Sequence, residues 1–182
     1  ENGFKKFAKG QIINPARHEF YFNKGSVESM SASDEDYFSC KIVNTHKGNP
    51  INYGLPTIIA NGILIDGQTG YPLMITGSTI LTALRTGVAS AIATKHLAKK
   101  GYNKLGIIGN GSQSIPQLHA ISLVRDIERV FIYDTDILAS SSFKKSAEKL
   151  FKNIKVEILL NSKEVCNKSD ILVTATCKDK DT

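Results

Sequence analysis

The second half of the chain alternates short apolar runs with segments of helical periodicity. Beyond Gly101, apolar runs lie at 104–108, 129–134, 155–160 and 170–175. The segments between them, around 113–124, 137–152 and 162–168, repeat their apolar positions with the period of a helix. Nearly continuous apolar runs are typical of parallel strands that are covered on both faces. The pattern predicts an α/β fold with a Rossmann-type doubly wound parallel sheet.

The residues before position 78 show a different pattern, in which short β-like runs are separated by turn signals. These runs lie at 19–22, 37–43, 57–60, 62–65 and 73–75. Asp66-Gly67 and Thr69-Gly70 are turn dipeptides, so we expect 63–65 and 73–75 to form a hairpin. This part of the chain is predicted to contain an antiparallel or mixed sheet.

One long helix is expected between the two halves. From Ser78 onwards, apolar residues recur at helical spacing among many alanines, and Gly101 ends the pattern. The predicted organisation is a domain at 1–77, a linking helix at 78–100 and a Rossmann domain at 101–182. Only four strands are expected in that last domain, whereas a complete one usually has about six, so we expect it to be truncated at its C-terminus.

Composition narrows the possible functions. The 182 residues carry a net charge of +6, but Lys and Arg are scattered, Trp is absent and no basic stretch is interleaved with aromatics, so no nucleic-acid partner is expected. No run is long enough to span a membrane, and the first residues lack a signal peptide's apolar region. The scattered cysteines indicate reduced thiols and a cytoplasmic location, with Cys40 and Cys166 buried. No metal site is expected among the histidines.

A Gly-x-Gly turn follows the first predicted strand of the second half. Gly109 allows a tight turn, and Gly111 lets the backbone approach a pyrophosphate without a Cβ in the way. The following helix would direct free N–H groups and its positive dipole end at the phosphates. The third glycine of the usual motif is Ser114 here, which is small enough for close packing.

An acidic residue stands at the end of the next predicted strand. Asp134 lies 23 positions beyond Gly111, close to the spacing of about 20 that this motif requires. Its carboxylate would accept hydrogen bonds from ribose hydroxyls and repel a 2′-phosphate, so NAD is predicted rather than NADP. In the alternative interpretation, the glycines form a turn in a flavodoxin-like sheet that binds nothing, and Asp134 caps a helix. No Gly-Lys-Ser/Thr follows, which excludes a P-loop.

Several blocks of residues resemble a known family. They are Cys40-Lys41-Ile42-Val43-Asn44, Tyr53-Gly54-Leu55-Pro56-Thr57, Thr69-Gly70-Tyr71-Pro72-Leu73, Leu81-Thr82-Ala83-Leu84-Arg85-Thr86, Ile108-Gly109-Asn110-Gly111-Ser112-Gln113-Ser114 and Tyr133-Asp134-Thr135-Asp136. In this order they closely resemble the ornithine cyclodeaminase/mu-crystallin family, and its ornithine cyclodeaminase branch in particular. The resemblance runs from about Arg17 to the end of the chain.

The resemblance implies a fold and an activity. Family members are homodimers with a mixed α/β domain for substrate binding and dimerisation, followed by a Rossmann domain. The cyclodeaminase converts L-ornithine to L-proline and ammonia: hydride leaves the α-carbon for NAD⁺, the δ-amine attacks the resulting imine, ammonia departs, and NADH reduces the cyclic product. The family's catalytic aspartate is expected beyond Thr182, in a natural protein longer than this chain.

The same resemblance assigns roles to single residues. Arg17 falls where the family binds the substrate carboxylate, Lys41 at its active-site lysine, and Glu28 at an acidic position that exchanges protons with an amino group. Arg85 matches a position that contacts substrate or cofactor. The expected cofactor-binding residues are Thr57, Arg85, Gly109, Asn110, Gly111, Ser112, Gln113, Asp134 and Thr176.

Other interpretations remain open at this point. Arg17 and Glu28 are also consistent with surface charges, Lys41 with an edge-strand lysine, and Arg85 with a solvated helix residue. The same site would serve an alanine dehydrogenase, a ketimine reductase or an amino-acid dehydrogenase of siderophore or opine synthesis. A mu-crystallin-like protein that binds a nucleotide and a small ligand without catalysis is the non-enzymatic alternative.

Overall fold

The chain folds as two compact units, Glu1–Thr82 and Ala83–Thr182, in a computed structural model that describes residues 1–176. Each unit has its own sheet, and the helix α3 (Thr79–Leu97) begins in the first unit and continues in the second. No helix within the described residues is both long enough and apolar enough to cross a membrane. The functional roles assigned to the domains stay predictions.

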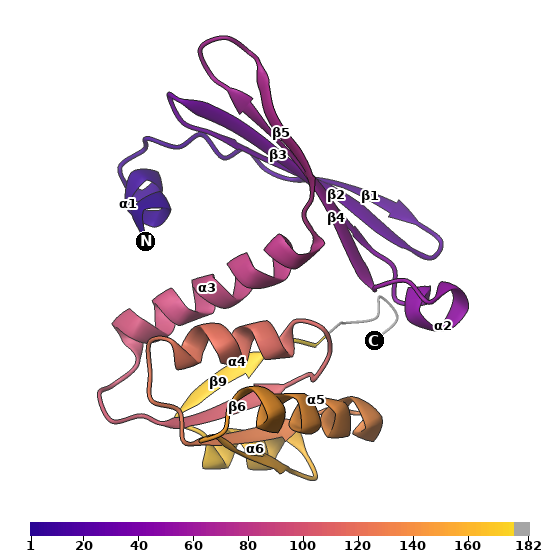
Figure 1. Cartoon of the computed structure of the whole chain (residues 1–182), viewed down its shortest axis with the longest axis vertical. Helices are drawn as coiled ribbons and strands as arrows, with labels where there is room; N and C mark the ends of the chain where they lie inside the picture. Colours follow the sequence, from indigo (N-terminus) through magenta and orange to yellow (C-terminus); the bar gives the residue numbers. More distant parts are fainter. Residues whose placement is uncertain (177–182) are drawn as a thin grey trace. The chain divides into compact units, whose positions relative to one another are not determined.

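The first unit is a five-stranded antiparallel sheet with two short helices (Figure 1). Its strands pair in chain order, and the predicted hairpin is confirmed because Ile63 pairs with Ile75. The elements are α1 (Asn2–Ala8), β1 (His18–Phe22), β2 (Gly25–Ser33), β3 (Tyr37–Thr45), α2 (Asn49–Tyr53), β4 (Ile58–Asp66) and β5 (Pro72–Gly77).

Three features of this unit differ from the expectation. The strand β2 was not predicted, since its sequence consists largely of small and polar residues, yet it pairs with both β1 and β3. The runs at 57–60 and 62–65 form one strand, β4, which continues through Gly62. A Cβ at Gly62 would lie 2.6 Å from the Oγ of Ser78, so the glycine makes room for the chain that leads into α3. The short helices α1 and α2 were also missed.

The second unit contains the predicted parallel sheet, with strands in the order β8-β7-β6-β9. These are β6 (Lys104–Ile108), β7 (Arg129–Tyr133), β8 (Lys155–Ile158) and β9 (Ile171–Thr174), and the helices are α4 (Ser114–Ser122), α5 (Ile137–Leu150) and α6 (Ser162–Lys168). Helices cover both faces of the sheet, so the α/β fold class is confirmed (Figure 1). Most elements end one to three residues inside their predicted bounds.

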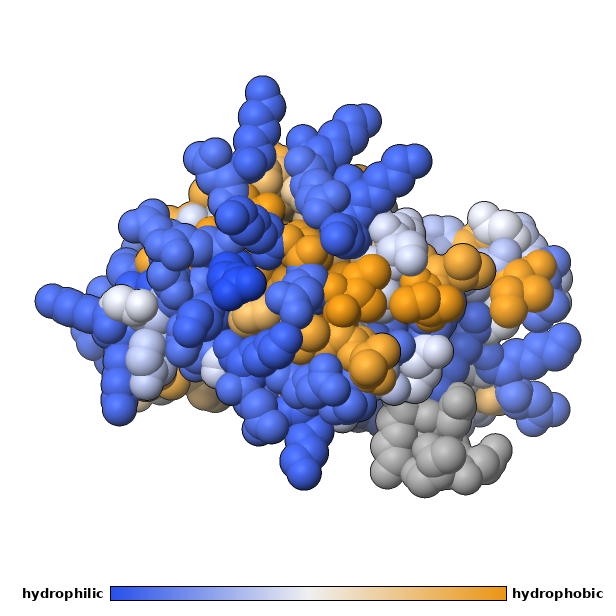
Figure 2. Space-filling model, turned by 90° about the horizontal axis from the view of Figure 1, so that it is seen from below, coloured by the Kyte–Doolittle hydropathy of each residue, from blue (hydrophilic) through white to orange (hydrophobic). Residues whose placement is uncertain are grey.

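The core of this unit lies between the sheet and its helices. Leu105, Ile107 and Ile132 are fully buried in the sheet, and Leu118 and Ile121 of α4 pack against them. The helix α3 approaches α4 closely at Gly87, where a Cβ would lie 2.5 Å from the carbonyl oxygen of Pro116. Some apolar side chains also reach the surface, between long hydrophilic ones (Figure 2). Leu160, for example, is 86% exposed.

The environment of the cysteines corrects one expectation. Cys166 is exposed on α6 rather than buried, while Cys40 is half-buried with its Sγ 3.7 Å from the Oγ of Ser29. Both thiols are free, as predicted. Cys177 lies outside the described residues. The burial prediction for Cys166 was wrong because the inner side of a two-turn helix is occupied by Val165, which is completely buried.

The C-terminus of α3 is closed by an arginine from the loop after α4. One guanidinium nitrogen of Arg125 donates to the carbonyl oxygens of Thr94, Lys95 and Ala98 at 3.0–3.2 Å. Thr94 and Lys95 lie in the last turn of α3 and Ala98 follows it; the Thr94 carbonyl also accepts from the N–H of Ala98, whereas carbonyls at a helix end generally lack intrahelical donors. A cation there also interacts favourably with the helix dipole. Arg125 therefore anchors α3 to the α/β unit.

We expect Arg125→Met to lower the free energy of unfolding by about 1.5–3 kcal/mol, since it removes charged hydrogen bonds while keeping most of the side-chain volume. Urea unfolding followed by circular dichroism measures the change. Arg129→Met is the matched control because that side chain is 53% exposed, and its effect should stay below about 0.5 kcal/mol. Equal losses in the two variants would contradict the anchoring role of Arg125.

Candidate dinucleotide site and substrate face

A cavity of about 370 Å³ lies at the carboxyl ends of the parallel strands in the second unit. The strands β7 and β9 flank β6 on opposite sides, so the chain reverses its direction of strand addition here. Ligands of open α/β sheets bind at such a switch point. The cavity is lined by residues that follow β6, β7 and β9: Ile108, Gly109, Gly111, Tyr133, Asp134, Thr135, Ala175 and Thr176.

The two glycines of the turn meet different surroundings. Gly109 has a φ of +91°, and a Cβ there would lie 2.6–2.7 Å from backbone atoms of Ala175 and Thr176. A Cβ at Gly111 would have no neighbour within 4 Å. Gly109 is therefore required by the fold itself, whereas the bare backbone of Gly111 faces open space in which a phosphate can approach.

The helix α4 begins directly after this turn. Gln113 is its N-cap residue, and no side-chain hydrogen bond caps the helix. The N–H of Ser114 donates to the carbonyl oxygen of Gly111 at 3.1 Å and Pro116 has no N–H, so the N–H of Ile115 and the positive end of the helix dipole remain in the first turn to bind an anion. Ser114, which replaces the third glycine of the motif, is 1% exposed, and its Oγ donates to the carbonyl oxygen of Gly111 at 2.5 Å. The substitution thus adds a hydrogen bond that closes the turn, which a glycine could not make.

Asp134 lines the cavity and is held by backbone donors. Its Oδ2 accepts a hydrogen bond from the N–H of Asn110 at 2.6 Å, and its Oδ1 accepts one from the N–H of Asp136 at 2.9 Å. The N-cap of α5 is Asp136, whose side chain accepts from the N–H of Leu138. The alternative in which Asp134 caps this helix was therefore wrong, and its carboxylate is placed at the cavity instead.

Charged residues that the resemblance assigns to the substrate share one face of the antiparallel sheet. In the strand register, Glu28 pairs with Glu19 and Val43, and Lys41 pairs with Met30 and Gly62. Directly paired residues project to the same face, and residues two apart along a strand share it. Glu28 and Lys41 therefore lie on the same face.

Arg17 joins this face through two carboxylates. Its guanidinium donates to Glu28 at 3.0 Å and lies 3.9 Å from Glu19. The structure thus brings together Arg17 and Glu28, two residues that were each predicted to belong to the substrate site. Tyr21 donates a hydrogen bond to Glu19, and this bond raises the pKa of the tyrosine hydroxyl. Glu19 and Tyr21 were not predicted from the sequence, although their alternation with Arg17, which directly precedes β1, was a usable signal.

The remaining predicted site residues are not among those that line the cavity. Ser112 is exposed in the turn before α4, and Arg85 is exposed on α3. Asn110 is 5% exposed, and its side chain accepts a hydrogen bond from Ser140, so it supports the turn from behind. Thr57 precedes β4 in the first unit, where its carbonyl oxygen accepts from the N–H of His46. Their contacts with substrate or cofactor stay predictions.

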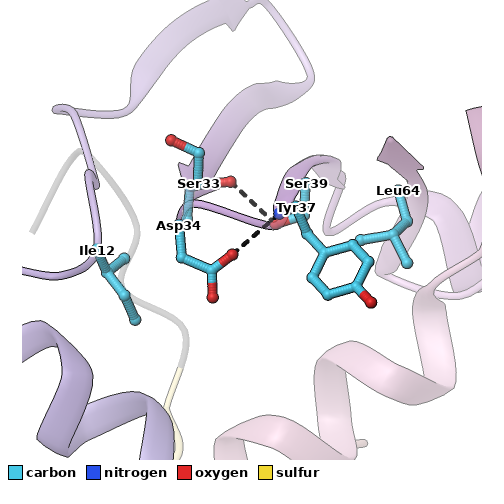
Figure 3. Close-up of a pocket in the computed structure, with 7 residues that line it drawn as sticks. Ile12, Ser33, Asp34, Tyr37, Ser39 and Leu64 are labelled. Carbon is cyan, nitrogen blue, oxygen red and sulfur yellow. Dashed lines mark hydrogen bonds between the residues drawn. The ribbon is translucent and has the colours of Figure 1, made fainter. Parts of the chain in front are cut away.

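A second, smaller cavity of about 160 Å³ lies beside the turn between β2 and β3 (Figure 3). Its carboxylate, Asp34, accepts from the N–H groups of Asp36 and Tyr37 and from the ammonium of Lys6 at 2.8 Å. The Lys6 ammonium lowers the pKa of Asp34. The carboxylate oxygens of Asp34 thus hold the turn and α1. The position of Asp34 at this cavity is therefore explained by the fold. Within residues 1–176, no group of His, Cys, Asp and Glu is arranged to hold a metal ion.

These features define a dinucleotide-binding protein of the Rossmann class with a charged face on a separate antiparallel sheet. The chain belongs to the ornithine cyclodeaminase/mu-crystallin family, whose model matches residues 1–182. The resemblance inferred from the sequence blocks is confirmed.

Three curated relatives have different activities. The alanine dehydrogenase of Archaeoglobus fulgidus is 38% identical over 97% of this chain and 53% of its own length. The ornithine cyclodeaminase of Agrobacterium fabrum is 36% identical over 84% of this chain and 42% of its length. The delta(1)-pyrroline-2-carboxylate reductase of Bacillus thuringiensis is 32% identical over 94% and 54%. The chain therefore spans about half the length of the relatives it matches.

Solved structures agree with this assignment. An archaeal alanine dehydrogenase dimer with bound NAD has a TM-score of 0.87 at 37% identity, covering 96% of this chain and 53% of that one. The delta(1)-pyrroline-2-carboxylate reductase of Thermococcus litoralis, with NADH and L-proline, has a TM-score of 0.91 at 33% identity, covering 96% and 55%. A lysine cyclodeaminase reaches 0.90 at 33% identity, covering 98% and 52%. The predicted cofactor agrees with the nucleotides in the first two.

The contrast between the two glycines gives a testable prediction. Gly109→Ala should destabilise the protein by at least about 1–3 kcal/mol, because the new Cβ meets backbone and the residue has a positive φ. Gly111→Ala should leave the unfolding midpoint unchanged, since the new Cβ meets nothing, yet weaken NADH binding more than about tenfold. Urea unfolding and NADH fluorescence titration separate the two effects. Unchanged NADH affinity in Gly111→Ala would remove the pyrophosphate from this turn.

Proposed function

We propose that the protein is an NAD-dependent ornithine cyclodeaminase that converts L-ornithine to L-proline and ammonia. The proposal is supported most directly by two features that occur in one chain of this family: a Rossmann turn with Asp134, and a sheet face that carries Arg17, Glu28 and Lys41. NAD would accept a hydride from the substrate α-carbon and return it to the cyclised product.

The residues of the second unit fit NAD. The open space at Gly111 and the positive dipole end of α4 suit the pyrophosphate, and the Asp134 carboxylate suits ribose hydroxyls. A negative charge at Asp134 would repel the 2′-phosphate of NADP. Thr176, which lines the same cavity, would contact the cofactor beside β9. Thr57 and Arg85 would complete the contacts with the nicotinamide or phosphate portion.

The charged face of the first unit would hold the amino acid. Arg17 offers a planar fork of donors that matches a carboxylate, and Lys41 adds a second positive charge on the same face. Glu28 would exchange protons with an amino group of the substrate. Binding of the substrate carboxylate to Arg17 would replace its present ion pair with Glu28 and free that carboxylate for proton transfer.

Ornithine is favoured among the possible substrates because several cyclodeaminases match the chain, one of them, from Brucella suis, at 42% identity over 118 residues. Alanine oxidation is the second candidate, supported by the 38% identity with the archaeal alanine dehydrogenase over nearly the whole chain. Both reactions move a hydride from the α-carbon of an amino acid, so the same residues would serve either one.

The test uses the full-length gene product that contains this chain, incubated with L-ornithine and a trace of NAD⁺. We expect proline and ammonia in equal amounts, without net NADH, by mass spectrometry and a coupled ammonia assay. Lys41→Ala should abolish turnover while leaving NADH binding within about twofold, since Lys41 belongs to the sheet and not to the dinucleotide unit.

Lys24→Ala, which alters an exposed turn between β1 and β2, is the control and should retain full turnover. NADH production from L-alanine without proline from ornithine would favour the second candidate. Turnover that survives in Lys41→Ala would remove that residue from the site. NAD binding without turnover of any amino acid or cyclic imine would favour a binding protein.

We also propose that the opposite face of the antiparallel sheet pairs two copies of this chain. Large apolar side chains there are exposed, among them Phe20, Phe22, Phe38, Ile42 and Ile75 at 36–78%. The strand register places no Asp, Glu, Lys or Arg among the paired residues of this face. A large exposed apolar surface of this kind marks an interface, and the similar archaeal alanine dehydrogenase is a dimer.

Replacing Ile42 and Ile75 together by Glu should convert the dimer to a monomer at micromolar concentration, because four charges would be buried at a twofold interface. Sedimentation velocity measures the mass of the full-length protein. Leu160→Glu is the control, since this exposed leucine belongs to the other unit and should leave the dimer intact. A monomeric unmodified protein would contradict the proposal.

A further inference from the structure

Four hydrogen bonds link the dinucleotide turn, the end of β7 and the start of α5 in a closed ring. The N–H of Asn110 donates to Asp134 Oδ2 at 2.6 Å, and the N–H of Asp136 donates to Asp134 Oδ1 at 2.9 Å. The N–H of Ser140 donates to the carbonyl oxygen of Asp136 at 3.2 Å. The Oγ of Ser140 then donates to the side-chain oxygen of Asn110 at 2.9 Å and closes the ring.

The closing bond is completely shielded from water. Ser140 is 0% exposed and Asn110 is 5% exposed. Among the described residues, the Nδ2 atom of Asn110 has no partner, so the bond from Ser140 is the one that fixes this side chain. A buried hydrogen bond is expensive to lose because the acceptor left behind is not solvated. Ser140, the ring member that lies farthest along the chain from the turn, therefore fixes the side chain of Asn110.

We infer that Ser140 is a positioning residue that sets the dinucleotide specificity of the site through Asn110 and Asp134. This inference rests on the proposed binding of NAD. Each oxygen of a carboxylate has two lone-pair positions, and the ring occupies one on each oxygen of Asp134. One acceptor position then remains on Oδ2 at the wall of the cavity, and the second position on Oδ1 meets the hydroxyl of Thr135 at 3.4 Å, a long bond that a ribose hydroxyl can replace. Two neighbouring ribose hydroxyls have the matching pair of donors.

The ring also fixes how strongly Asp134 rejects a 2′-phosphate. A carboxylate held by two backbone donors cannot turn away from an incoming negative charge, whereas a mobile one can. Loss of the Ser140 bond should therefore weaken binding of NADH and leave binding of NADPH almost unchanged. A role in stability alone would instead lower the affinity for both nucleotides together.

The experiment measures the dissociation constants of NADH and NADPH by fluorescence titration of the full-length protein. We expect Ser140→Ala to weaken NADH binding about tenfold and NADPH binding less than twofold, so the preference for NADH falls about tenfold. Ser141→Ala is the matched control: the same substitution, one residue on, removes an exposed Oγ that donates only to the carbonyl oxygen of Ile137 within α5. It should leave both constants unchanged.

A double-mutant cycle tests whether Ser140 acts through Asp134. In the Asp134→Asn background, which already removes the charge, Ser140→Ala should cause no further loss of NADH affinity. Full additivity of the two losses, or an equal fall in NADH and NADPH affinity, would overturn the inference. Failure to form proline from ornithine with the preference for NADH intact would count against the proposed reaction alone, and absence of NADH binding in the unmodified protein would overturn both.

Discussion

The close approach of two backbone segments at Gly109 is the constraint on which the dinucleotide site depends. The chain that leaves β9 lies against this residue, so near that any side chain would collide with main-chain atoms of Ala175 and Thr176. This contact brings the end of β9 beside the end of β6 and forms one wall of the cavity. The positive φ of Gly109 then directs the chain toward α4 and Gly111 into open space. Gly109 thus determines both the packing of the chain after β9 and the direction in which Gly111 faces open space, where a ligand would approach.

The antiparallel sheet of the first unit separates charged from apolar side chains by the alternation of its strands. One face carries Arg17, Glu28 and Lys41, and the other carries exposed aromatic and aliphatic side chains with no charge among its paired residues. A slip of one residue in the register would exchange the two faces. The register of β2 against β3 therefore determines whether the charged residues can act together.

The parallel sheet and its turn could be predicted because periodicity and the glycine spacing act over short distances along the chain. The family was predictable from blocks of residues, and so was the pairing of Ile63 with Ile75 from turn chemistry. The strand β2 could not be predicted, since its small polar residues are strand-forming only through pairing on both sides. The exposure of Cys166 and the ring through Ser140 depend on tertiary packing, which no local pattern encodes.

The proposed class of reaction rests on features that several relatives share, whereas the proposed substrate does not. Relatives named for alanine oxidation, ornithine cyclodeamination and pyrroline-carboxylate reduction match it at 38%, 36% and 32% identity, and each match covers about half of the relative. What their chemistry has in common is hydride exchange at a carbon beside a carboxylate. In the proposed function, the dinucleotide turn and the cationic residues Arg17 and Lys41 would serve that shared step. The preference for one amino acid must then depend on contacts with the rest of the substrate, which the Gly109 turn and the Arg17 face do not distinguish.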